Sequence, residues 1–157
     1  MLKKTVLAGI ACLFALPSAG SAAEVRFRGA FTLVAVKNCI ARYVGETFSS
    51  AYRPAGLGDN PNVTSLTQFN QFSGDVYELP DAVFPLDRWV RVNGHGIDNL
   101  HYEFAAHIKI TSQEPEVITG RTRFVSLTGF IENVGNDPGL GGTCIASFRG
   151  SYFRRVE

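Results

Sequence analysis

Residues 100–111, Leu-His-Tyr-Glu-Phe-Ala-Ala-His-Ile-Lys-Ile-Thr, alternate between two kinds of side chain along their whole length. Every second position is apolar or aromatic, and the positions between them are charged or polar except for Ala105. A period of two residues places one set of side chains on each face of a β-strand. We therefore expect a strand with one face in the core and the other in solvent. The expected core face carries Leu100, Tyr102, Phe104, Ala106, Ile108 and Ile110.

The segments on either side of this strand have a similar pattern. Alternating or β-rich runs cover residues 24–36, 39–45, 47–53, 75–79, 88–92, 117–134 and 144–154, whereas residues 63–72 fit either an irregular segment or a strand. Gly29 interrupts the first run, as a bulge or a close approach of another backbone does. Turn-forming residues separate the runs at 54–62, 93–96, 112–116 and 135–142. The sequence therefore predicts an all-β fold, a single antiparallel sandwich or barrel of about seven or eight strands.

The first residues have the features of a cleaved signal peptide. Lys3 and Lys4 precede an apolar run at 5–16, and small residues follow at 17–23. We expect cleavage before Glu24, which leaves residues 24–157 as a single all-β domain. The alternative, a membrane anchor, needs a longer apolar run of about 17 residues or more. The sequence thus predicts a soluble protein, exported by a bacterium to the periplasm or the medium.

The charge balance argues against a nucleic-acid partner. The chain carries 15 Lys and Arg residues and 14 Asp and Glu residues, and cleavage removes Lys3 and Lys4, so the mature chain has about one more acidic than basic side chain. The charges are scattered singly and form no basic stripe in the sequence. We expect no nucleic acid as a partner, no membrane span after cleavage, and a monomer.

Two cysteines remain after cleavage, and each begins a similar stretch. Cys39 and Cys144 both open the pattern Cys-Ile-Ala, any residue, aromatic, any residue, Gly. The two stretches are either a degenerate repeat or two answers to the same packing need, and the chain between them shows no repeat. In an oxidising compartment we expect them to form a disulfide. The alternative, a reactive or metal-bound thiol, requires a nearby Cys or His, which the sequence does not offer.

The histidines suggest a metal site only weakly. His95, His101, Glu103 and His107 share one strand parity, and zinc accepts imidazole and carboxylate ligands. However, His101 and His107 lie about 20 Å apart along an extended strand, and Lys109 on the same face indicates solvent. We therefore expect no metal and no cofactor.

Two loops are rich in residues with side-chain oxygens. Asp59, Asn60, Asn136 and Asp137 could ligate calcium, but Asn and Asp are also the ordinary residues of Gly- and Pro-rich turns. Because loops carry sites more often than packed strands do, we expect binding at the loops 54–62 and 135–142. The candidate binding residues are Tyr52, Asp59, Asn60, Phe84, Asn136 and Asp137.

No catalytic motif, such as Gly-x-Ser-x-Gly, occurs in the chain. We therefore expect a non-catalytic exported domain that binds a small molecule, a glycan or a protein. Two alternatives remain open: a structural or envelope-associated β-protein, and a periplasmic enzyme. An aqueous cavity, an exposed apolar patch, or histidine and carboxylate groups converging in a cleft would distinguish these classes.

Overall fold

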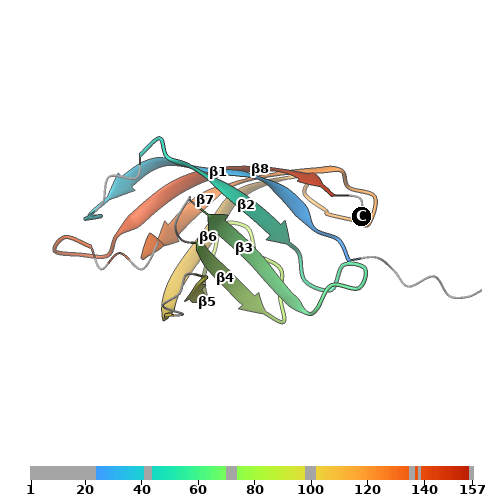
Figure 1. Ribbon diagram of the computed structural model, residues 1–157, viewed down its shortest axis with the longest axis horizontal. Helices are drawn as coiled ribbons and strands as arrows, with labels where there is room; N and C mark the ends of the chain where they lie inside the picture. Colours follow the sequence, from blue (N-terminus) through green and yellow to red (C-terminus); the bar gives the residue numbers. More distant parts are fainter. Residues whose placement is uncertain are drawn as a thin grey trace, which may run out of the picture.

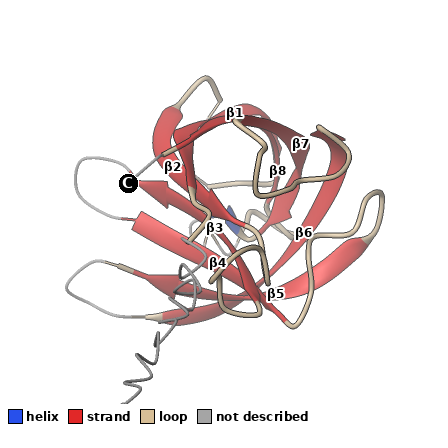
Figure 2. Ribbon diagram, turned by 90° about the vertical axis from the view of Figure 1, so that its right-hand side faces the viewer, coloured by secondary structure: helices blue, strands red, loops and turns tan. Residues whose placement is uncertain are grey.

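The protein is a closed antiparallel barrel of eight strands, in which each strand pairs with its neighbours in sequence and β8 pairs with β1. A computed structural model describes residues 24–40, 44–69, 74–97, 102–134, 137 and 139–155. Figures 1 and 2 show the barrel from the side and from one end. The strands are β1 (Phe27–Lys37), β2 (Thr47–Arg53), β3 (Val63–Phe69), β4 (Gly74–Pro80), β5 (Trp89–Gly96), β6 (Glu103–Glu114), β7 (Phe124–Glu132) and β8 (Ile145–Arg154). The all-β prediction is confirmed, and a barrel rather than a sandwich forms.

The interior is filled by aromatic and aliphatic side chains from alternate positions of the strands. Phe31 and Phe148 stack across β1 and β8 with ring centroids 4.7 Å apart. Tyr52 and Tyr152 lie 6.0 Å apart between β2 and β8. All four rings are almost completely buried. This packing follows directly from the period of two, which points one side of each strand into the barrel.

One end of the interior is polar. Gln68 donates from Nε2 to Asp75 Oδ2 at 2.9 Å and to the Tyr77 hydroxyl at 3.0 Å. The Tyr102 hydroxyl donates to Asp75 Oδ1 at 2.8 Å. These hydrogen bonds offset the cost of burying Gln68 and Asp75, although Gln68 Oε1 has no partner within the described part of the chain.

The core prediction holds for most of its residues. Phe27, Phe31, Ile108 and Phe148 are buried, Tyr102 and Phe104 are half-buried, and Glu103 is exposed. Lys109 was expected in solvent but is half-buried, because its neighbours in register are Trp89 and Phe130. His101, expected on the same face, lies outside the described residues.

The predicted turn at 93–96 is wrong, because β5 continues to Gly96. A Cβ atom on Gly94 would lie 2.4 Å from the Phe104 ring, and one on Gly96 would lie 2.5 Å from the Tyr102 ring. The two rings of the neighbouring strand segment therefore take the space of the missing side chains. Here glycine marks ring packing within a sheet and not a reversal of the chain.

Gly29 lies within β1 at a close backbone approach, which was one of its two predicted roles. A Cβ atom at this position would lie 1.8 Å from the Ser151 carbonyl oxygen on β8. The register irregularity of β1 is found elsewhere, between Leu33 and Ala35.

The disulfide between Cys39 and Cys144 is present, with the two Cα atoms 4.4 Å apart. The prediction that Cys39 opens a strand is wrong, because Cys39 follows β1, whereas Cys144 directly precedes β8 as expected. Since β1 and β8 are the strands that close the barrel, the disulfide links them at one end of this seam. A disulfide is consistent with an oxidising, exported environment. Among the described residues, no helix has the length and apolarity needed to cross a bilayer.

Candidate functional site

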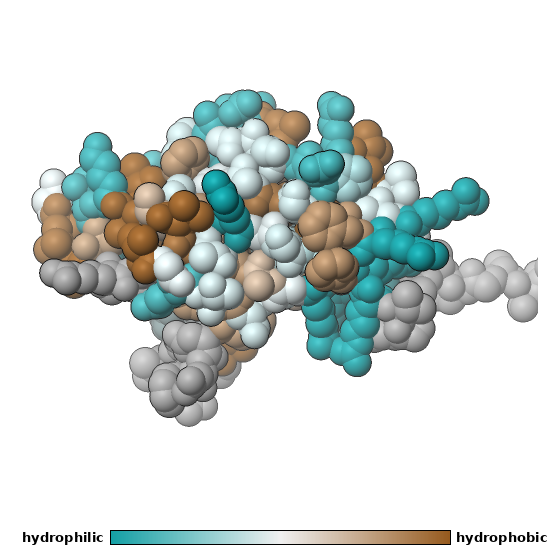
Figure 3. Space-filling view, turned by 90° about the horizontal axis from the view of Figure 1, so that it is seen from above, coloured by the Kyte–Doolittle hydropathy of each residue, from teal (hydrophilic) through white to brown (hydrophobic). Residues whose placement is uncertain are grey.

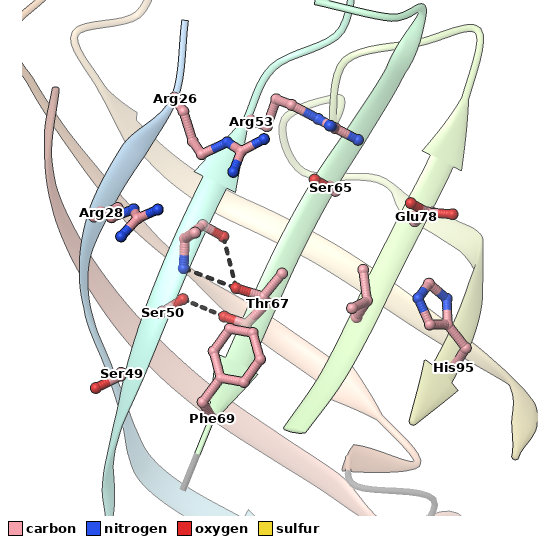
Figure 4. A pocket seen from close by; sticks show the side chains of 12 residues that line it. Arg26, Arg28, Ser49, Ser50, Arg53, Ser65, Thr67, Phe69, Glu78 and His95 are labelled. Carbon is pink, nitrogen blue, oxygen red and sulfur yellow. Dashed lines mark hydrogen bonds between the residues drawn. The ribbon is translucent and has the colours of Figure 1, made fainter. Parts of the chain in front are cut away.

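A groove of about 510 Å³ crosses the outer wall of the barrel over β2 and β3. Its floor is low because the outward positions of these strands carry small side chains: Ser49, Ala51, Ser65 and Thr67. The Ala51 amide donates to Thr67 Oγ1 at 2.9 Å, and the Ser50 hydroxyl donates to the Thr67 carbonyl oxygen. Figure 4 shows these bonds along the floor. The floor is thus held rigidly by two paired strands.

Three arginines form one side of this groove. Arg26 and Arg28 lie at the start of β1, and Arg53 ends β2. The register pairs Arg28 with Ala51, so the Arg28 side chain lies directly beside the floor. Figure 4 shows the three guanidinium groups towards the end of the groove away from Phe69, with Arg28 beside β1 and Arg53 extending over β3 near Ser65. Guanidinium groups are well suited to carboxylates, sulfates and phosphates because their donors form a planar fork.

Two of the arginines already hold an acidic group. Arg26 Nη2 donates to the two carboxylate oxygens of Glu24 at 3.0 and 3.1 Å, and Arg53 Nη1 donates to Glu24 Oε1 at 3.3 Å. The hydrogen bond from Arg26 lowers the pKa of Glu24 below its usual value; partial burial opposes this shift and Arg53 adds to it. Glu24 shows that this end of the groove accommodates a carboxylate.

The arginine wall retains unused donors. Arg28 is exposed and forms no ion pair with any residue in the described part of the chain. Arg53 Nε is buried and has no hydrogen-bond partner among the residues that the structure describes. Because this atom is buried, a ligand in the groove cannot reach it, and the exposed guanidinium of Arg28 is the donor that remains available among the described residues. The wall therefore has the capacity to bind an anion beyond Glu24.

The opposite wall consists of Val76, Glu78 and His95, from β4 and β5. Phe69 stands at the end away from Arg53, and its ring lies against Gly74, where a Cβ atom would be only 2.4 Å away. Glu78 and His95 also line a neighbouring groove of about 620 Å³ over β5 and β6. Together the two grooves offer an elongated surface with a phenylalanine in each, Phe69 in the first and Phe104 in the second. The second groove adds Arg91, Asn93 and Glu103.

The predicted loop residues do not form a common site. Tyr52 and Phe84 were expected to frame a shallow surface, but both are buried and their rings stack 6.4 Å apart. Asn60 is buried and holds the backbone: it accepts from Val25 N and donates to the carbonyl oxygens of Val25 and Pro54. Asp59 is exposed in the loop between β2 and β3.

The other predicted loop lies elsewhere. Successive strands of the barrel run in opposite directions, so the β2–β3 and β7–β8 connections are at opposite ends (Figure 1). Asp137 is buried near the disulfide and accepts from the amides of Ile40 at 2.9 Å and Gly139 at 2.8 Å. Asn136 lies outside the described residues. The expectation that both loops contribute to one site at the same end is therefore wrong.

The histidines have separate environments. His107 Nδ1 lies 2.9 Å from Glu132 Oε2, and His95 is the register partner of Glu103. His101 lies outside the described residues.

Potential metal-ligand atoms of Cys39, Asp137 and Cys144 lie within 4.8 Å of one another. Because the two sulfur atoms are bonded to each other, they offer no thiolate to a metal ion.

Sequence reasoning missed the groove residues. The signal was present as small residues at alternate positions of two neighbouring strands, Ser49 and Ala51 in one and Ser65 and Thr67 in the other. This pattern indicates a groove only once the strand register is known, because the register places the arginines beside the small residues. Comparisons of this chain with family models, curated proteins and solved structures found no match.

Proposed function

We propose that this chain is an exported, non-catalytic binding module whose outer-wall groove binds an elongated, negatively charged ligand. The observation that carries the proposal is the row of Arg26, Arg28 and Arg53 beside a floor of small side chains. The groove volume of about 510 Å³ lies in the range of small-ligand sites. The Glu24 carboxylate, held by two of the arginines, is the internal example of the chemistry that the site accepts.

The hydroxyl groups and Phe69 favour an acidic glycan within this class. Ser49, Ser65 and Thr67 bring hydroxyl groups to the floor, and they suit a ligand with many hydroxyl groups of its own. Phe69 offers an apolar ring to one face of such a ligand. An acidic peptide is the competing member of the class, and the same binding assay distinguishes the two.

Binding of soluble probes to the exported protein tests the proposal. The probes are an oligouronate, a sulfated oligosaccharide, a poly-glutamate peptide and a neutral oligosaccharide, measured by calorimetry. We expect binding of the acidic oligosaccharides and none of the neutral one. Substituting Arg28→Ser removes a charged donor that has no partner in the described structure, and should weaken binding by about 1.5–3 kcal/mol.

Three further variants keep the test specific. Ala51→Phe fills the floor without removing a charge, and we expect it to abolish binding. Ser126→Phe adds the same ring to an outward position of β7, and Arg149→Ser removes an exposed arginine from the middle of β8. If these two controls weaken binding as much as the groove variants do, the groove is not the site. Equal binding of the neutral probe refutes the proposed ligand class.

A catalytic role in the same grooves is the second candidate. His95 lies there with Glu78 and Glu103, and these side chains serve as general acids and bases in hydrolases. Glu103→Gln distinguishes the two functions. If an acidic oligosaccharide is cleaved by the native protein, and the variant binds it without cleaving it, the protein is an enzyme.

A further inference from the structure

A pair of exposed phenylalanines lies on the outer wall next to the arginines. Phe124 on β7 and Phe153 on β8 are register partners, and their ring centroids are 5.1 Å apart. Their relative exposures are 39% and 64%, so each ring leaves a large apolar area in water. Val117, in the connection that precedes β7, is 71% exposed. Large exposed apolar side chains that gather on one face mark a contact surface.

The register surrounds this pair with arginines. Arg28 on β1 is the partner of Phe153, so Phe124, Phe153 and Arg28 form one row across three strands. Beyond this row the backbone of Arg155 donates to the carbonyl oxygen of Arg26 at 3.2 Å.

One more arginine completes the face. Arg121, in the connection that precedes β7, is exposed. We name this surface the basic aromatic face: Arg26, Arg28, Arg121, Phe124, Phe153 and Arg155.

The charges of the chain are unevenly distributed. The basic aromatic face holds four arginines in a chain whose acidic and basic residues nearly balance. In Figure 3 strongly hydrophilic side chains gather at the right-hand end, with hydrophobic ones beside them. In Figure 1 this is the end at which the C-terminus and the β2–β3 connection lie. The register thus places an arginine, Arg28, directly beside the exposed aromatic pair.

We propose that the basic aromatic face docks the protein on a lipid bilayer that contains anionic headgroups. Aromatic side chains partition into the interface of a bilayer, and arginines beside them are attracted to the phosphate groups. The face combines both features on the convex outer wall of a barrel, where a flat surface can reach them together. Charge complementarity therefore identifies the occupant as an anionic bilayer.

This docking is distinct from the proposed function. The aromatic pair lies on β7 and β8, whereas the groove floor lies on β2 and β3. Only Arg26 and Arg28 belong to both surfaces. Each proposal can therefore be refuted without the other. Ala51→Phe fills the groove and leaves the phenylalanines unchanged, and substitution of the phenylalanines leaves the groove floor unchanged.

Vesicle flotation of the exported protein tests the docking. The vesicles are pure phosphatidylcholine, or phosphatidylcholine with roughly one-third phosphatidylglycerol. We expect binding to the anionic vesicles at least tenfold stronger than to the neutral ones, and loss of binding at high salt. The double variant Phe124→Ser with Phe153→Ser should lower the partition coefficient about tenfold.

A matched control uses the other exposed aromatic pair. Trp89 and Phe130 are 40% and 37% exposed, with ring centroids 6.3 Å apart, and their register neighbour is Lys109. The double variant Trp89→Ser with Phe130→Ser should bind anionic vesicles within twofold of the native protein. Circular dichroism establishes whether each variant is folded. If the Phe124 and Phe153 double variant does not fold, the single variant Phe153→Ser is used instead, and we expect it to weaken vesicle binding severalfold.

Four results overturn the proposal: no binding to anionic vesicles, equal binding to neutral ones, an equal loss in the Trp89 and Phe130 control, or unchanged binding in the phenylalanine variant. Sedimentation of the protein without lipid tests the competing occupant. A dimer that the phenylalanine substitutions dissociate would assign the face to a second copy of the chain, and would also overturn the bilayer proposal.

Discussion

Removing the disulfide should lower the stability of the barrel without opening it. Cys39 and Cys144 are 105 residues apart, so the bond closes most of the chain into a loop in the unfolded state. The chain-entropy model gives a loss of about 4–5 kcal/mol for a loop of this length. In the folded state the neighbouring backbone is held independently, because Leu140 N donates to Asn38 O at 2.7 Å and Asn133 N donates to Cys144 O at 2.8 Å. The folded barrel should therefore survive reduction.

Guanidinium unfolding of the native protein, the reduced protein and the double variant Cys39→Ala with Cys144→Ala measures the loss. We expect the midpoint to fall by about 1 M in both modified forms. Reduced native protein separates the loss of the bond from the small cavity that alanine leaves at the buried Cys144. Two results would refute the reasoning. A loss below about 1 kcal/mol would show that the unfolded chain is not constrained as the model requires. A change in the far-ultraviolet spectrum of the folded state would show that the bond holds the seam together.

Two further predictions concern the barrel wall and its interior. Gly29→Ala should destabilise the fold by more than about 3 kcal/mol, because the Ser151 carbonyl oxygen of a paired strand occupies the position of the new Cβ. In the control Gly120→Ala the new Cβ meets no atom within 4 Å, so the free energy of unfolding should change by less than about 0.5 kcal/mol. Thermal unfolding measures both. Burial raises the pKa of Tyr52 and Tyr152 well above the usual value of 10, so both hydroxyls stay protonated in the folded state while those of the unfolded chain ionise. Ionisation of these two tyrosines should leave stability unchanged below pH 10 and lower it above pH 10 by about 1.4 kcal/mol per pH unit for each tyrosine. Tyr152→Phe should reduce the slope by that amount in denaturant titrations at a series of alkaline pH values. A slope unchanged by that substitution would contradict the assignment.

The strands were largely predictable from the sequence because alternation is a local property. The face that Phe104, Ile108 and Ile110 share is visible in the sequence and is the face that packs inside. The errors arose where a distant residue decides the local structure. Gly94 and Gly96 resemble a turn until the Phe104 and Tyr102 rings are seen to fill their places.

The candidate site was not predictable in the same way, because it depends on register. Arg26 and Arg28 are 25 or more residues from Arg53 and read as scattered surface charges in the sequence. Pairing of β1 with β2 brings them to one wall, and pairing of β1 with β8 places Phe153 beside Arg28. The loop residues Tyr52 and Phe84 were chosen by their neighbours in sequence, and tertiary packing placed both inside the barrel.

The pairing of β1 with β8 also constrains how the chain can be delivered. Of the paired strands β1 and β8, β1 is the first in the chain and β8 is the last. If the chain crosses a membrane starting from its N-terminus, one edge of β1 stays unpaired until β8 has crossed. An unpaired edge is a template for pairing with other chains. The interval between the two strands is therefore the period in which the protein is most exposed to aggregation. A nascent chain halted before residue 145 should need a holding chaperone, which the completed barrel does not.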